Sequence, residues 1–130
     1  MKYWLVTLLL FTGLICVNAG VKAQQAKAYE TVRYKAKAGN LIFLLDYADG
    51  YIGASRIRLK QNGQKTQIFL PESGTTESNG DFKFVPQRSA DKTEITLTRL
   101  NDEETAPPVI RGTYRAKDHP VGLMFKRSKN

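Results

Sequence analysis

The sequence has few of the side chains that usually perform catalysis or hold metals. Its 130 residues include one cysteine (Cys16), one histidine (His119) and one tryptophan (Trp4). A zinc site needs several His or Cys ligands, and a hydrolase triad needs a histidine that converges with a nucleophile and a carboxylate. No Gly-x-Ser-x-Gly motif is present, and Asp118-His119-Pro120 is typical of a tight turn. The sequence therefore predicts no metal site, no cofactor and no catalytic residue.

A small hydrolase remains the least favoured alternative. Paired carboxylates can cleave glycosides, and the candidates are Asp46, Asp49 and the cluster Asp102-Glu103-Glu104. We expect Asp46 near a rim that water reaches, and the cluster in a solvated turn. No spacing marks any of these carboxylates as a buried acid.

The N-terminus has the pattern of a secretory signal peptide. Lys2 precedes the apolar run Tyr3–Val17, and small residues follow at Ala19 and Ala23. The run is shorter than the roughly 20 apolar residues that span a bilayer, although an uncleaved anchor is an alternative. We predict a signal peptide over residues 1–23, cleaved after Ala23 or Ala19, and a periplasmic or extracellular protein with no transmembrane segment in its mature chain. Lipid attachment at Cys16 is disfavoured because the preceding Ile15 is large for a lipobox.

Acidic residues are fewer than basic ones. The formal charge is +8, and removal of Lys2 and Lys22 with the leader lowers it to +6. Such a surplus favours anionic partners, such as lipid headgroups, acidic glycans or an acidic protein, while export disfavours nucleic acid. Simple solubility is the alternative explanation.

The mature chain lacks any convincing helical period and alternates instead with the period of β-strands. We expect eight short strands: 29–38, 41–47, two within 55–70, 81–85, 93–100, 109–115 and 121–125. Short strands at even spacing predict one all-β domain over residues 24–130, and short connections favour a small antiparallel up-and-down β-barrel over a β-sandwich. The side chains expected inside include Val32, Tyr34, Ala36, Ile42, Leu44, Ile57, Leu59, Ile68, Phe82, Phe84, Ile95, Leu97, Ile110, Tyr114, Val121, Leu123 and Phe125.

Two Asx-Gly dipeptides, Asp49-Gly50 and Asn62-Gly63, predict strand reversals through two-residue turns. The second turn would place Lys60 opposite Lys65, Arg58 opposite Gln67 and Ile57 opposite Ile68. Gly53, inside a stretch that favours β-structure, predicts a bulge or tight bend. The run Leu41–Tyr47 is apolar on both faces, so its inward face is not determined by alternation.

Eight meandering strands in a small exported domain resemble the calycin architecture of lipocalins and fatty-acid-binding proteins. The likeness is architectural. The Gly-x-Trp motif that opens lipocalins is missing, because Trp4 lies in the leader. No functional residue is transferred on this basis.

Two binding surfaces follow from the predicted sheet. Basic residues alternate along two strands and would form a basic face if both rows lie on one side: Arg33, Lys35, Lys37, Arg56, Arg58 and Lys60. This face predicts a non-enzymatic binding module for a protein, a glycan or an anionic surface. The alternative is a carrier of a small apolar ligand in the lumen, with Tyr47 and Tyr51 at the rim and Leu44 and Phe84 in the lining; a filled interior is the simpler reading for so short a chain.

Overall fold

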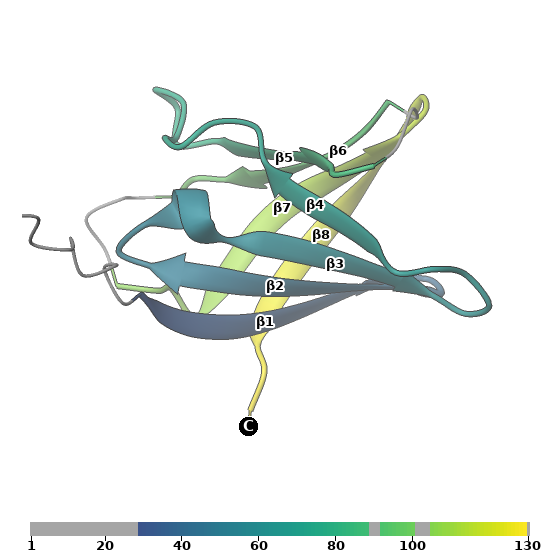
Figure 1. Cartoon of the computed structure of the whole chain (residues 1–130), viewed down its shortest axis with the longest axis horizontal. Helices are drawn as coiled ribbons and strands as arrows, with labels where there is room; N and C mark the ends of the chain where they lie inside the picture. Colours follow the sequence, from purple (N-terminus) through teal and green to yellow (C-terminus); the bar gives the residue numbers. More distant parts are fainter. Residues whose placement is uncertain (1–28, 89–91, 101–104, 130) are drawn as a thin grey trace, which may run out of the picture.

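The computed structural model describes residues 29–88, 92–100 and 105–129. The predicted signal peptide with Cys16, and the acidic turn 101–104, lie outside the described residues. Eight antiparallel strands form a closed barrel in sequence order: β1 (Glu30–Ala38), β2 (Leu41–Asp49), β3 (Arg56–Gln61), β4 (Gln67–Pro71), β5 (Phe82–Pro86), β6 (Thr93–Thr98), β7 (Val109–Ala116) and β8 (His119–Arg127) (Figure 1). One 3-10 turn, η1 (Ile52–Ala54), lies between β2 and β3. The predicted up-and-down barrel is confirmed, and the sandwich is excluded.

Strand alternation fills the barrel with apolar side chains. Eight interior side chains have no surface that water can reach: Phe43, Leu45, Ile57, Phe69, Phe84, Ile95, Leu97 and Phe125. The predicted inward faces of β1, β5, β6 and β7 are confirmed by their burial patterns. The core is therefore one continuous cluster that runs the length of the barrel.

Three of the predicted turns differ from the observed ones, at Asp49-Gly50, at Asn62-Gly63 and at Asp118-His119-Pro120. The chain does reverse after Asp49, but through a longer connection that includes η1, where Gly50 has φ +85 and the Ser55 hydroxyl accepts a hydrogen bond from the Ala48 amide at 2.9 Å. The final hairpin turns at Lys117-Asp118, so His119 is already part of β8.

The pairing of β3 with β4 is shifted by one residue from the prediction. Ile57 lies opposite Phe69 and Arg58 opposite Ile68, which is the register of a turn one residue longer than the predicted two-residue turn, and β4 begins only at Gln67. A shift of one residue exchanges the two faces of a strand. Phe69 is consequently buried, and Ile68 lies on the outer side.

The ambiguous strand β2 places Phe43, Leu45 and Tyr47 inside. Leu44 and Ile42 alternate with them and lie on the outer face, opposite Arg58 and Lys60 of β3. The prediction that Ile42 and Leu44 line the lumen was therefore wrong. The large aromatic Phe43 fills the interior better than its neighbours.

The barrel closes between β1 and β8, where Tyr34 lies opposite Arg127 and Lys35 opposite Lys126. The Ser128 amide adds a hydrogen bond to the Arg33 carbonyl at 2.9 Å. The Tyr34 hydroxyl donates to the Pro107 carbonyl at 2.5 Å, and Arg127 donates to the Ala106 carbonyl. Both sides of this seam are thus fastened to the connection that precedes β7.

Among the residues that the structure describes, none form a helix with the length and apolar character that crossing a bilayer takes.

Candidate functional site

The two predicted rows of cations lie on one outer side of the barrel. Arg33 of β1, Asp46 of β2 and Arg56 of β3 are direct neighbours across the sheet. Two residues further along the strands, the outward-facing neighbours are Lys35, Leu44 and Arg58. Two residues further again, they are Lys37, Ile42 and Lys60. We use the name basic face for Arg33, Lys35, Lys37, Arg56, Arg58 and Lys60. Its two rows lie two strand spacings, about 10 Å, apart and carry a cation about every 7 Å.

One carboxylate joins the three arginines of this face. Asp46 lies 3.1 Å from Arg56 and 3.3 Å from Arg58, with Arg33 further away at 3.8 Å. Only 12% of the Asp46 side chain is exposed, so it lies among the arginines rather than at a watery rim, in contrast to our expectation. The Nε of Arg58 is buried without a hydrogen-bond partner in the described chain. Three cations around one anion leave this end of the face with a surplus of positive charge.

The lysines of the basic face have no such compensation. No acid of the described residues forms an ion pair with Lys35, Lys37 or Lys60. Lys126 of β8 lies opposite Lys35 and extends the positive charge across the seam. Between the lysine rows lie the partly exposed side chains Ile42 and Leu44. The face therefore combines uncompensated ammonium groups with a narrow apolar strip.

Another side of the barrel has a balanced surface. Lys83 of β5 lies 3.8 Å from Glu72 and 4.0 Å from Glu94, and Arg115 of β7 lies 3.7 Å from Glu94. Charge is thus segregated in the described chain: mixed ion pairs lie over β5–β7, whereas over β1–β3 the cations surround Asp46 and the other two acids, Glu30 and Asp49, lie at the strand ends.

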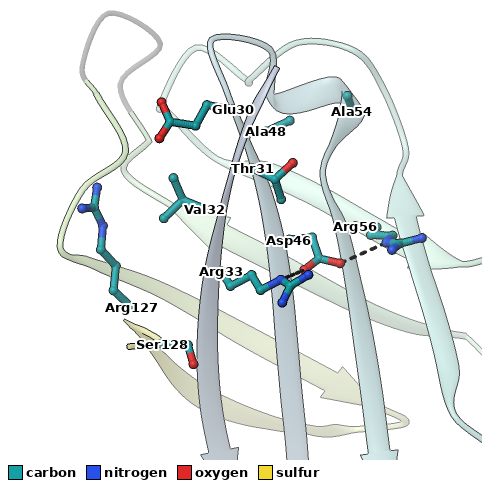
Figure 2. A pocket seen from close by; sticks show the side chains of 10 residues that line it. All are labelled: Glu30, Thr31, Val32, Arg33, Asp46, Ala48, Ala54, Arg56, Arg127 and Ser128. Carbon is teal, nitrogen blue, oxygen red and sulfur yellow. Dashed lines mark hydrogen bonds and ion pairs between the residues drawn. The ribbon is translucent and has the colours of Figure 1, made fainter. Parts of the chain in front are cut away.

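An open hollow of about 820 Å³ adjoins the arginine end of the basic face. Figure 2 shows Arg33 and Arg56 on either side of Asp46, with Arg127 and Ser128 on the other side of β1. Side chains of β1, β2, β3 and β8 line this hollow, and the lining includes two carboxylates, Glu30 and Asp46. An anionic group could lie here against Arg33 and Arg56.

The residues predicted to line the lumen and rim are not brought together. Phe84 is fully buried against Phe82, with ring centroids 5.2 Å apart, and Tyr47 packs edge-on against Tyr34 at 6.0 Å. Tyr51 is 46% exposed and stacks on Tyr29 at 5.3 Å. With Leu44 on the outer face, these positions form no common cavity.

Sequence reasoning missed two residues that adjoin the basic face. Asp46 was assigned to a rim, although the tight Gly39-Asn40 turn already places it opposite Arg33. Lys126 lies beyond the predicted last strand, 121–125, and its place beside Lys35 had no local signal because it depends on closure between the first and last strands.

In the part of the chain that is described, no group of three or more His, Cys, Asp or Glu side chains is placed to hold a metal ion. A comparison with protein-family models, with curated proteins and with solved structures finds no match.

Proposed function

We propose that this protein is an exported, non-enzymatic binding module that holds a polyanionic partner on its basic face. The observation that carries the proposal is the segregation of charge. Seven cations, counting Lys126, lie on the outer side of four adjacent strands around one carboxylate, Asp46. Like charges on neighbouring strands repel, and a negative partner relieves that repulsion.

The shape of the face favours an extended partner, either an acidic glycan chain or an acidic protein surface. Two rows of cations run parallel to the strands, with an apolar strip between them. A chain with regularly spaced carboxylates or sulfates can contact several lysines at once. The apolar strip offers contact to the uncharged parts of the same chain.

The interior supports this choice over the carrier alternative. The eight side chains without water-accessible surface leave no space beside them for a ligand. Binding on the outer surface requires no rearrangement of such a core.

The test is binding of the mature chain to heparin, a sulfated polyanion, measured by calorimetry at physiological salt. We expect Lys35→Glu/Lys37→Glu/Lys60→Glu to weaken binding at least tenfold, since exposed charge pairs contribute up to about 1 kcal/mol each and about 1.4 kcal/mol is a factor of ten. These lysines are chosen because they have no acidic partner, so that their replacement breaks no ion pair of the fold.

A charge-matched control is Arg88→Glu/Arg99→Glu/Arg111→Glu, which removes the same charge at three exposed arginines outside the basic face. This control should keep most of the heparin affinity. Equal losses in both variants would show that net charge alone determines binding, and undiminished affinity in the first variant would refute the proposal.

A further inference from the structure

The β3–β4 and β7–β8 hairpins lie at the same end of the barrel (Figure 1). A hollow at this end is lined by residues outside the basic face. Its volume is about 520 Å³, which lies within the range of small-molecule sites. The lining comes from the β3–β4 hairpin on one side and from the ends of β6 and β7 on the other. We call this hollow the lysine mouth.

The floor of the lysine mouth is apolar and closed. Tyr114, which is 7% exposed, reaches across the barrel to Phe43 and Phe69, with ring centroids 5.2 Å and 6.3 Å apart. Leu59, from the opposite wall, is 6% exposed. A ligand in the mouth therefore rests on an aromatic and an aliphatic surface but cannot pass into the filled core.

The rim of the lysine mouth is cationic. Three of its lining residues are Lys65, Lys92 and Lys117, and none of the described lining residues is acidic. The three lysines come from three separate connections, so their proximity is a property of the closed barrel and not of a basic sequence run. Ammonium groups gathered around a hollow attract an oxyanion into it.

Two further features favour a ligand over plain solvent. The Thr93 hydroxyl is buried and has no hydrogen-bond partner in the described chain, although Thr93 lines the mouth. Leaving a buried hydroxyl unpaired costs stability. Because this oxygen has almost no water-accessible surface, a ligand oxygen would satisfy it only after a small shift of the chain at the mouth. Lys117 has φ +55, a conformation that glycine or asparagine adopts at lower cost, so the turn itself gives no reason for a lysine there.

From these observations we infer that the lysine mouth binds a small organic anion, with its oxyanion head among the lysines and a compact apolar body on Tyr114 and Leu59. This site is independent of the basic face. The closed floor keeps the ligand out of the barrel core.

The probes are phenyl phosphate and benzoate, with uncharged benzamide as the matched control, titrated into the isotopically labelled mature chain and followed by NMR. We expect saturable shifts at Leu59, Thr93 and Tyr114 with either anion and weak, non-saturating shifts with benzamide. The anion that binds with the higher affinity indicates whether the site prefers a phosphate or a carboxylate head group. No saturation by either anion up to about 10 mM, or equal binding of benzamide, would overturn the inference.

Two variants distinguish this site from general attraction to a basic protein. Lys92→Gln/Lys117→Gln should weaken anion binding about tenfold or more, whereas Lys35→Gln/Lys37→Gln on the basic face should leave it unchanged.

Thr93→Val should weaken binding severalfold while leaving thermal stability equal or higher, since it removes an unpaired hydroxyl. The opposite result, lower stability with unchanged binding, would make Thr93 structural and refute its role. Heparin binding tests the basic face separately. The proposed anion site of the lysine mouth can therefore be refuted while the proposed heparin site stands, or the reverse.

Discussion

Asp46 has a dual effect at the scale of single residues: it holds the arginines of the basic face in place and also reduces the positive charge of that face. Its three partners differ in side-chain exposure, from 70% for Arg33 to 31% for Arg58. Pairs this exposed to water contribute little individually, whereas Asp46 itself is nearly enclosed. The Asp46 carboxylate should therefore stabilise the fold but lower the affinity of the basic face for an anionic partner.

Asp46→Asn should separate the two effects. We expect the free energy of unfolding to fall by about 1 kcal/mol, because three charge pairs are weakened while one amide hydrogen bond can persist. Heparin affinity should rise severalfold, since the face loses the negative charge that lies among its arginines. Urea unfolding and calorimetry measure the two quantities, with Asp49→Asn as the control. A loss of heparin affinity would show that Asp46 orders the arginines for binding.

At the scale of elements, β4 shows how one residue of register determines which side chains form the core. The observed pairing buries Phe69 and leaves Ile68 outside, opposite Arg58. Phe69→Ala should cost about 3–5 kcal/mol of unfolding free energy, whereas Ile68→Ala should cost less than about 1 kcal/mol. Denaturant unfolding of the two variants measures both values. The reverse order would indicate the pairing first expected from the Asn62-Gly63 dipeptide.

Sequence patterns predicted the elements wherever apolar and polar residues alternate. In β1, β5, β6 and β7 the inward face follows directly from residues such as Tyr34, Phe82 and Ile95. The same reasoning failed at β2 and β4. Both strands are apolar on each face, so periodicity does not indicate which face is buried. Loop length decided the register at β4, and a glycine turn signal does not determine loop length.

The candidate sites were predictable to different degrees. The basic face was accessible from sequence, because its residues lie on hairpin-linked strands and their alternation is regular. The lysine mouth was not, because Lys65, Lys92 and Lys117 lie in separate connections that only barrel closure brings together. Sites built from local strand pairs can be read from sequence, whereas sites built by closure need the structure.

At the scale of the whole molecule, the β1–β8 seam makes the sheet a barrel, and Tyr34 is its central residue. Burial raises the pKa of Tyr34 above 10.0, and the nearby Arg127 offsets part of this effect. In the unfolded chain the phenol loses its proton first as pH rises. The stabilisation that Tyr34 provides is therefore complete below about pH 10 and decreases as pH rises towards the folded-state pKa.

Tyr34→Phe removes both the hydrogen bond to Pro107 and this titration. We expect a loss of about 1 kcal/mol at neutral pH and a shallower decline in stability above pH 10 than in the unmodified protein. Chemical denaturation at a series of pH values measures both effects. Parallel pH curves for the two proteins would show that Tyr34 does not titrate in this range.

Seven of the eight strand pairings join consecutive strands, whereas the pairing of Tyr34 with Arg127 joins positions about ninety residues apart. Each hairpin can form as soon as its two strands have emerged, but the seam must wait for the last strand of the chain. During that interval β1 is an unpaired edge, which is the usual starting point for aggregation. Lys35 and Lys37 stand along this edge and repel a second copy. The lysines that we assign to partner binding would thus also protect the nascent sheet until it closes.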